Sequence, residues 1–148
     1  SDIGSMVARA ERQGDGYLIN GEKLFVSGGP QADFFILFAK VGAQEGSAGL
    51  TAFILPTASP HLFQLRQDRG MGVRGVPHPD YALEDYFLPA SLRLGEEGQG
   101  YEIARRSLNA AQPVTAARAL GLAERCLSYA LDYSLTRRIY GAFLADLG

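Results

Sequence analysis

Phe25 and Ser27 are the residues whose types and spacing are best suited to ligand chemistry. Asn20-Gly21 is typical of a two-residue hairpin turn, because both residue types tolerate positive φ, so a strand is expected to restart at Glu22. Side chains two apart on a strand share a face, which places the Phe25 ring beside the Ser27 hydroxyl with Val26 opposite. A flat aromatic wall and a hydroxyl then lie side by side. An ordinary strand with one core aromatic and a surface serine is the alternative interpretation.

Other polar and glycine motifs lack the spacing that a site requires. Gly98-Gln99-Gly100 begins like a dinucleotide-binding loop, but Ile103 stands at the third glycine position, and no βαβ pattern surrounds it. A flexible link between domains is the better interpretation. Neither histidine has another ligand type at metal spacing, so no metal site is expected. Glu84 and Asp85 are neighbours that would face opposite sides of a strand, which indicates a solvated edge.

Composition limits the function further. The chain has 148 residues, with 14 basic and 16 acidic side chains interspersed along it, which argues against a nucleic-acid partner. Cys126 is the single cysteine, so a reducing compartment is expected rather than a disulfide framework. No segment approaches the run of about 18 apolar residues that spans a membrane, and no charged-then-apolar leader opens the chain. A soluble, cytoplasmic protein without membrane insertion is therefore predicted.

The first part of the chain has the pattern of an all-β unit. Asp15-Gly16 and Asn20-Gly21 bracket a short strand, which predicts an antiparallel meander of three strands. Two apolar runs, 33–39 and 50–55, are expected to be strands buried on both faces. Further strands are expected at 62–66 and 81–88. Strands this short and numerous predict a barrel or two packed sheets, because such packing buries both faces and removes edges.

After Gly100 the pattern changes to that of helices. Pro113 is favourable only in a first turn, so we expect a short helix from Tyr101 to Leu108 and a long one from Pro113 to about Arg138. Apolar residues at helical spacing form one face of the long helix: Leu120, Ala123, Leu127, Ala130 and Leu131. This chain supplies few partners for that face, so self-association is expected. Arg137 and Arg138 in a last turn before Gly141 are typical of a helix C-terminus.

The predicted fold class is thus mainly β with C-terminal α. An antiparallel β-barrel or two-sheet domain over residues 1–97 precedes one short and one long helix over 98–148.

Five stretches in order along the chain resemble the acyl-CoA dehydrogenase family. They are Ser1-Asp2-Ile3-Gly4-Ser5, the segment around Phe25-Val26-Ser27, Met71-Gly72-Val73-Arg74-Gly75, Leu94-Gly95-Glu96-Glu97-Gly98-Gln99-Gly100-Tyr101 and Thr136-Arg137-Arg138-Ile139-Tyr140-Gly141. The resemblance covers the whole chain. It implies a middle β domain followed by the first helices of a C-terminal helical domain, and hence a fragment of a longer enzyme.

The resemblance also implies cofactor-binding residues for FAD. In similar enzymes an aromatic residue flanks the isoalloxazine and a Ser or Thr two residues later hydrogen-bonds it, positions held here by Phe25 and Ser27, together with the Val26 backbone. The arginine of the last motif, Arg137, would reach the flavin pyrophosphate in a neighbouring subunit, with Tyr140 packed beside the cofactor. A guanidinium fork matches phosphate oxygens. Without the family, these two residues would be a helix-end charge and a packing aromatic.

Substrate-binding residues follow from the same resemblance. Ser1, Asn109 and Gln112 are implied to line the substrate channel. Similar enzymes often have an Asp and an Arg where this chain has Asn109 and Gln112, so acyl-CoA specificity is open. In one branch the catalytic glutamate stands at the position of Ala111, and alanine cannot take a proton. No catalytic residue is therefore expected in this chain, and the fragment should be inactive by itself.

The implied reaction is the α,β-dehydrogenation of an acyl-CoA or related thioester. A carboxylate would remove the α-proton while a hydride passes from the β-carbon to the flavin, and an electron acceptor and a homo-oligomer complete the expected partners. A flavin-dependent monooxygenase on the same scaffold is one alternative, favoured by the departures at Asn109 and Gln112. A non-enzymatic ligand-binding barrel is another. It would explain the β unit but not Arg137 and Tyr140 at the end of a long helix.

Overall fold

The computed structural model describes residues 2–44, 46–67 and 69–147. The strands are β1 (Arg9–Gln13), β2 (Gly16–Lys23), β3 (Phe34–Val41), β4 (Leu50–Pro56), β5 (Leu62–Gln67), β6 (Pro79–Pro89), β7 (Arg93–Leu94), β8 (Arg138–Ile139) and β9 (Ala142–Phe143). The α-helix is α1 (Gly100–Thr136), and the short 3₁₀ helices are η1 (Ile3–Ser5), η2 (Gly29–Gln31), η3 (Gly46–Gly49), η4 (Ala90–Leu92) and η5 (Leu144–Asp146). The chain divides into two compact units, Ser1–Ala104 and Arg105–Gly148.

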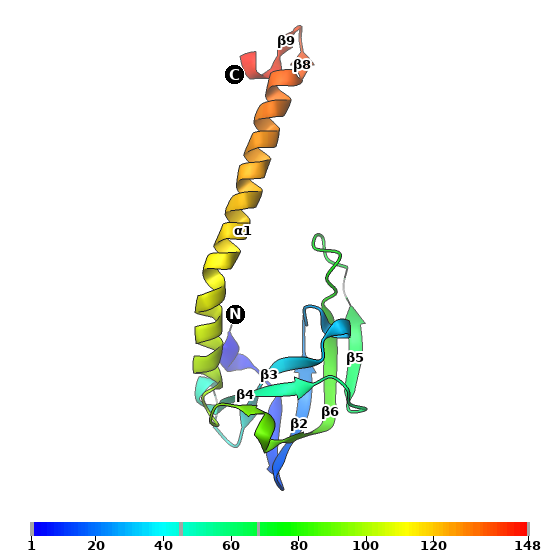
Figure 1. The fold of residues 1–148 in the computed structure, drawn as a ribbon, viewed down its shortest axis with the longest axis vertical. Coiled ribbons are helices and arrows are strands. Elements are labelled where there is room, and N and C mark those ends of the chain that lie inside the picture. The colour runs from blue at the N-terminus through cyan, green and yellow to red at the C-terminus, as the bar shows by residue number, and fades with distance from the viewer. Residues whose placement is uncertain (1, 45, 68, 148) are drawn as a thin grey trace. The chain divides into compact units, whose positions relative to one another are not determined.

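Seven strands of the first unit form one sheet in the order β5-β6-β2-β1-β3-β4-β7 (Figure 1). Neighbouring strands run antiparallel except β1 and β3, which pair in parallel at Arg9↔Lys40 and Ala10↔Val41. The sheet is therefore mixed, whereas the sequence predicted an antiparallel one. The prediction of a mainly β unit followed by helix is confirmed.

The sheet folds over so that its two halves pack face to face. Tyr17 of β2 meets Phe53 of β4 edge-on, with ring centroids 5.0 Å apart, although β1 and β3 lie between these strands in the sheet. Tyr86 of β6 donates a hydrogen bond of 2.7 Å to the carbonyl of Pro56 at the end of β4. In Figure 1, β3 and β4 run across β2 and β6. The two layers enclose one core, and Phe53 at its centre is fully buried.

Asn20-Gly21 does not form the predicted hairpin turn, because β2 runs straight through it. The turn between β1 and β2 lies earlier, where Gly14 has φ of 58°. Asn20 instead faces a bulge in β6: its Oδ1 accepts the N–H of Asp85 at 2.8 Å, and its Nδ2 donates to the Asp85 carboxylate at 3.2 Å. These bonds hold Asp85 in the left-handed region at φ 50°. The expected three-strand meander is consequently a two-strand hairpin.

The two apolar runs differ in burial. β4 is buried on both faces over most of its length, as the sequence predicted. β3 alternates instead: Phe35 and Leu37 face the core, whereas Phe34 is 56% exposed and Ile36 36% exposed. Both faces of β3 are therefore apolar, but only part of this apolar surface is buried within the chain.

A single helix, α1, replaces the predicted short and long pair and includes Pro113. The proline nitrogen cannot donate to the Asn109 carbonyl, a change that costs about 3 kcal/mol in a helix interior. Strong helix formers surround the proline and favour continuation: Ala110, Ala111, Ala116 and Ala117. The helix ends at Thr136, so Arg137 and Arg138 lie beyond its last turn rather than within it.

Candidate functional site

The segment that follows β2 is fixed to the start of β6 by three backbone N–H groups. Phe25 N–H donates to the Asp80 carboxylate at 2.8 Å, and Val26 N–H donates to the Pro79 carbonyl at 2.9 Å. Gly28 N–H donates to the Pro77 carbonyl, also at 2.9 Å. The segment is thus a tethered loop beyond the end of β2, not the regular strand that the sequence predicted.

Phe25 has φ of 53°, a backbone conformation that non-glycine residues rarely adopt and that costs on the order of 1–3 kcal/mol. Phe25 is 66% exposed, Ser27 is exposed, and Val26 between them is only 6% exposed and packs in the core. Residues in such conformations cluster at ligand-binding sites, where the surrounding structure holds them. The loop therefore presents a ring and a hydroxyl outward from a buried anchor.

The hydrogen-bonding groups of this loop divide between the fold and solvent. The Val26 N–H is bonded to Pro79, and the Val26 carbonyl accepts the N–H of Gly29 at 3.1 Å. The implied hydrogen bond from the Val26 backbone to a flavin would therefore have to share groups that the fold already uses. Within the described part of the chain, the Ser27 N–H and hydroxyl have no partner. Ser27 supplies the donors that remain for a ligand.

A cleft of about 300 Å³ lies beside the end of β2. Residues 5–8 line one side, residues 22–24 another, and Leu37 and Phe38 complete it. Two apolar side chains on its walls are exposed, Val7 by 81% and Leu24 by 51%. Burial lowers the pKa of Lys23 from its ordinary value. Most of the lining residues are apolar, and Lys23 is the only basic one among them. This arrangement suits a partly apolar ligand.

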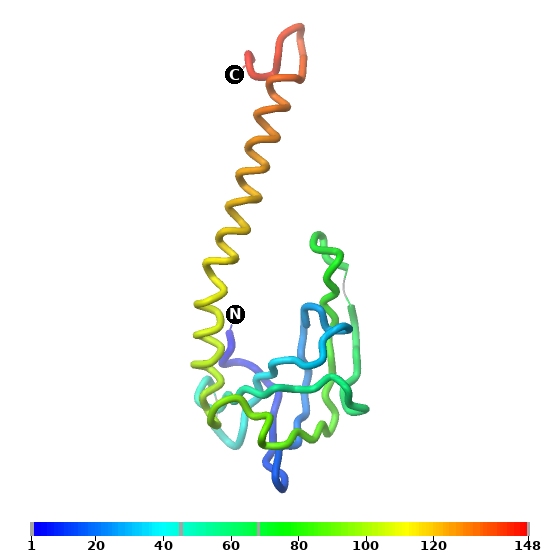
Figure 2. Tube along the Cα trace, in the orientation of Figure 1, coloured from blue at the N-terminus to red at the C-terminus, as the bar shows by residue number. Residues whose placement is uncertain are grey.

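The second unit ends in a short hairpin in which β8 pairs with β9 after α1 (Figure 2). Tyr140 and Gly141 form its turn with φ of 51° and 82°, the two positive angles that a two-residue hairpin turn favours. Tyr140 is 96% exposed, and Arg137 is exposed at the start of the hairpin. The Arg137 backbone is fixed by hydrogen bonds of 2.8 Å, from its N–H to the Tyr133 carbonyl and from the Leu144 N–H to its own carbonyl.

Sequence reasoning missed the role of Arg138. Its guanidinium carbon lies 4.1 Å from the centroid of the Phe143 ring, directly across the hairpin. This cation–π contact ties the two short strands together. Both adjacent arginines are exposed, but Arg138 is engaged by the Phe143 ring, which leaves the Arg137 side chain for a ligand.

The remaining predicted site residues lie on α1 or outside the described residues. Asn109 and Gln112 are exposed, and their spacing of three puts them on the same side of the helix. Ala111 between them is exposed and has no titratable group. Ser1 lies outside the described residues. Phe25, Val26 and Ser27 belong to the first unit, whereas the other described site residues belong to the second.

Two further searches concern the described residues alone. No group of three or more His, Cys, Asp or Glu residues among them could hold a metal ion. No helix among them is both long and apolar enough to cross a membrane.

Two family models match this chain. One is described as the middle domain of acyl-CoA dehydrogenase and covers residues 1–86, and the other as the C-terminal domain and covers residues 98–147. The chain belongs to the acyl-CoA dehydrogenase family. Cyclohex-1-ene-1-carbonyl-CoA dehydrogenase of Geobacter metallireducens is 34% identical over 147 residues, which are 99% of this chain and 39% of that protein. The chain thus spans well under half the length of this relative.

Solved structures of this family share the fold. The prolyl acyl carrier protein oxidase AnaB is 34% identical with a TM-score of 0.90, over 99% of this chain and 39% of AnaB. PigA, solved as an FAD complex, is 31% identical with a TM-score of 0.90, over 99% of this chain and 38% of PigA. The exposed Phe25 ring and the unpartnered Ser27 donors of this acyl-CoA dehydrogenase-family chain fit such a planar, hydrogen-bonding cofactor.

Proposed function

We propose that the protein containing this chain is an FAD-dependent oxidoreductase that dehydrogenates an acyl thioester between its α and β carbons. The loop that carries Phe25 and Ser27 is the observation on which the proposal depends. It combines a left-handed Phe25, held by Asp80, with the free donors of Ser27 and a buried Val26. Residues in such conformations cluster at ligand-binding sites, and Phe25 is exposed and outside the core cluster, so core packing does not account for its conformation.

When bound, FAD supplies the group that accepts a hydride from the substrate. The Phe25 ring would flank the flavin ring system, and the Ser27 hydroxyl and N–H would donate to its polar edge. Val26 holds both residues in place because its side chain is packed in the core. The chain's role toward the cofactor is to bind and orient it.

Arg137 and Tyr140 would complete the cofactor site from a second subunit. The exposed Arg137 guanidinium suits the FAD pyrophosphate, and the exposed Tyr140 ring suits the neighbouring part of the cofactor. A site divided in this way requires a homo-oligomer. We also propose that residues 1–97 form the middle domain and that residues 98–148 begin the C-terminal helical domain.

The substrate side of the proposal rests on α1. Asn109 and Gln112, with Ser1, would contact the thioester substrate, and Ala111 cannot act as a base. The carboxylate that removes the α-proton is therefore expected elsewhere in the parent protein, and this chain alone is expected to be inactive. Electrons would leave to an external acceptor. We expect a cytoplasmic location, because the single cysteine fits a reducing compartment.

Anaerobic mixing of the purified parent protein with acyl thioesters tests the reaction. Butyryl-CoA, longer acyl-CoAs and an acyl group on an acyl carrier protein should be compared, because relatives act on both carriers by name. Bleaching of the flavin absorbance by one of these thioesters, with formation of the α,β-unsaturated product, is expected. A flavin that thioesters leave oxidised, but that a nicotinamide reduces before oxygen is consumed, would instead identify the monooxygenase.

The divided site is tested by Arg137→Ala in the parent protein. Loss of a charge-assisted bidentate contact typically costs about 1.5–3 kcal/mol, or roughly tenfold to a hundredfold in affinity. FAD affinity and oligomer mass should fall together, because one contact serves both. Arg125→Ala is the matched control, since Arg125 is an exposed arginine within α1. A variant of Arg137 that retains the affinity of this control would contradict the role of Arg137 across the interface.

A further inference from the structure

The chain between β5 and β6 forms a second cleft in the first unit, with a volume of about 560 Å³. The described residues that line it all lie within 67–78, and three of them are basic: Arg69, Arg74 and His78. No acidic side chain is among these described lining residues. Asp68 is the one acidic residue in this part of the sequence, and it lies outside the described residues. Basic groups therefore predominate around this cleft, which we call the 67–78 cleft.

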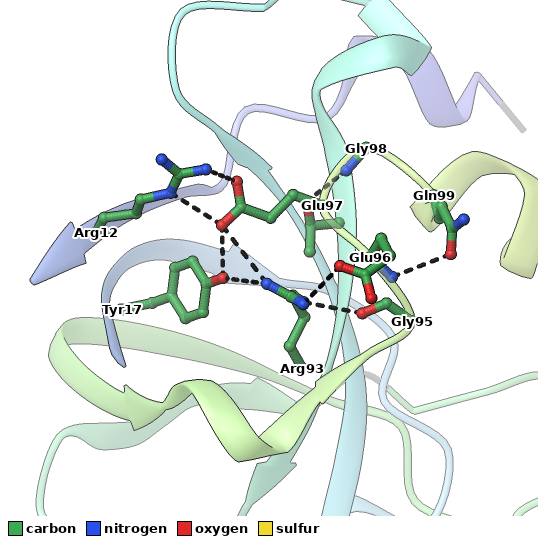
Figure 3. Close-up of polar contacts among 9 residues, drawn as sticks. Arg12, Tyr17, Arg93, Gly95, Glu96, Glu97, Gly98 and Gln99 are labelled. Carbon is green, nitrogen blue, oxygen red and sulfur yellow. Dashed lines mark hydrogen bonds and ion pairs between the residues drawn. The ribbon is translucent and has the colours of Figure 1, made fainter. Parts of the chain in front are cut away.

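Two other arginines of the first unit are held in a charged network around Glu97 (Figure 3). Arg12 of β1 donates from Nε to Glu97 Oε1 at 2.9 Å and from Nη2 to Oε2. Tyr17 of β2 donates from its hydroxyl to the same Oε1 at 2.6 Å. Arg93 of β7 donates from Nη1 to the Tyr17 hydroxyl at 3.0 Å, and this nitrogen lies 3.7 Å from Glu97 Oε1. Both guanidinium groups therefore serve the fold.

Arg69 and Arg74 have no such role. Both residues are exposed, and within the described part of the chain neither side chain makes a hydrogen bond or an ion pair. A guanidinium presents five N–H donors in a planar fork, which suits phosphate oxygens. Two such forks line one cleft here, so their donors are available to an anionic ligand.

The backbone of the 67–78 cleft is strained at its tip. Val73 has φ of 53°, a conformation that is exceptional for a β-branched residue. The Val76 N–H donates to the Val73 carbonyl at 3.0 Å and closes a turn that has Arg74 at its second position. Val73 is exposed and outside the core cluster, so core packing does not account for its conformation. Strain of this kind clusters at ligand-binding sites.

The walls of the cleft offer apolar surface and open space. Met71, Val73 and Val76 line it, and all three are exposed. A Cβ added at Gly72 or Gly75 would meet nothing within 4 Å, so a ligand can approach the backbone closely there. Small-molecule sites typically have volumes of about 300–1,000 Å³. The cleft therefore suits a ligand that combines anionic groups with an apolar body, as a nucleotide does.

The 67–78 cleft adjoins the loop that carries Ser27. Pro77 lines the cleft, and its carbonyl accepts the N–H of Gly28 at 2.9 Å. Two residues further along, the Pro79 carbonyl accepts the Val26 N–H, also at 2.9 Å. All of these residues belong to the first unit, so one compact unit sets their neighbouring positions.

We propose that the 67–78 cleft is a nucleotide site, in which Arg69 and Arg74 bind the phosphate groups. Met71, Val73 and Val76 contact the apolar surface of the base. Two nucleotides share this chemistry in the proposed reaction, the ADP half of FAD and the phosphorylated ADP of coenzyme A. The site itself does not depend on the proposed function, which bears only on the source of the nucleotide.

Modification of arginines by phenylglyoxal, located by mass spectrometry, tests the site residue by residue in the parent protein. ADP, adenosine 3′,5′-bisphosphate and adenosine should be compared, because adenosine lacks the phosphates. At ten times its dissociation constant, a phosphorylated nucleotide should slow the modification of Arg69 and Arg74 by about tenfold. Adenosine should not slow it. Arg125, an exposed arginine within α1, is the internal control and should react at one rate throughout.

The parent protein with its flavin, and the same protein after removal of the flavin, should both be tested. Protection by added nucleotide only after flavin removal would support the site and identify the ADP half of FAD as its ligand. Protection with the flavin in place would support the site and identify the coenzyme A nucleotide. If the parent binds no flavin, the proposed function fails, and the same protection in the flavin-free protein decides the inference.

Arg74→Met should raise the ADP concentration that half-protects Arg69 by about tenfold, because a charge-assisted contact is lost. Arg125→Met is the matched control and should leave that concentration unchanged. Equal modification rates at Arg69 and Arg74 with and without the phosphorylated nucleotides, in both forms of the protein, would overturn the inference. Equal protection by adenosine, or an Arg74→Met variant that behaves as the Arg125 control, would overturn it as well.

Discussion

The Phe25 N–H donates a hydrogen bond of 2.8 Å to the Asp80 carboxylate, and this contact holds Phe25 in the left-handed region with φ of 53°. Without a partner for this N–H, the backbone would relax toward an ordinary conformation, because the left-handed one costs on the order of 1–3 kcal/mol. The direction of the Phe25 ring therefore depends on a residue more than fifty positions later in the chain.

Asp80→Ala should weaken FAD binding by the parent protein. Loss of one hydrogen bond typically costs about 0.5–1.5 kcal/mol, or roughly twofold to tenfold in affinity if the ring turns away. Asp80→Asn is the control, since its amide oxygen can still accept the Phe25 N–H. Flavin titration measures both variants, and equal affinities for the two would show that Asp80 does not orient the ring.

Phe53→Ala should strongly destabilise the β unit, because Phe53 is fully buried between the two layers of the sheet and contacts Tyr17. Removal of a buried phenylalanine ring typically costs about 3–5 kcal/mol. Phe63→Ala is a control of the same chemistry, since Phe63 is 44% exposed on β5, and it should change the free energy of unfolding by less than about 1 kcal/mol. Urea denaturation of the chain would reveal the difference, and similar losses would contradict the packing described above.

The contribution of Glu97 to stability should depend on pH. The hydrogen bond from Arg12 is the main cause that holds the pKa of Glu97 below its ordinary value of 4.5, with a smaller contribution from Tyr17, while burial opposes them. Since the folded pKa lies below the unfolded one, this stabilisation is complete above the ordinary value and is lost as pH falls through the folded pKa. The difference in unfolding free energy between wild type and Glu97→Gln should shrink on acidification below pH 4.5. The same difference at neutral and strongly acidic pH would count against the network.

The helix α1 has apolar side chains on two opposite faces. Two sets share one spacing and are offset by two residues, which is about 200° around a helix. The first set is Leu120, Leu127 and Leu131, exposed by 70%, 61% and 54%, and the second is Leu122, Tyr129 and Tyr133, exposed by 63%, 64% and 49%. Such a helix requires partners on both sides.

The chain alone should therefore self-associate through α1. Leu127→Glu on one face and Tyr129→Glu on the other should each lower the mass seen by sedimentation, because a charge is costly in an apolar contact. Ser128→Glu, an exposed position between the two faces, should have little effect. A clean monomer for the wild-type chain would contradict this expectation.

Local patterns were sufficient to predict the general order of the fold. The change from strand-length apolar runs to helical spacing near Gly100 correctly separates the β unit from α1, since both periods are local properties. The exposed, buried and exposed sequence of Phe25, Val26 and Ser27 also follows the expected alternation, although the loop is not a strand.

Distant partners explain what the sequence could not predict. Asn20-Gly21 stays within a strand because Asn20 bonds to Asp85, a residue 65 positions away. Arg12 and Glu97 are 85 residues apart and gave no local signal. Pro113 would end a helix by its own preference, but the alanines around it favour continuation. At Asn20-Gly21 and at Pro113 the surrounding residues therefore override a local preference, whereas the Arg12–Glu97 pair has no local signature to read.

The FAD dissociation constant of the parent protein and its variants tests the central claim most directly. The parent should purify with flavin absorbance or bind added FAD. Phe25→Ala should weaken binding by about twofold to tenfold through loss of stacking, Ser27→Ala by a similar factor, and Phe63→Ala, the exposed aromatic control, should bind as the wild type does. A parent that binds no FAD, or Phe25 and Ser27 variants with the affinity of the Phe63 control, would contradict the proposed flavin site.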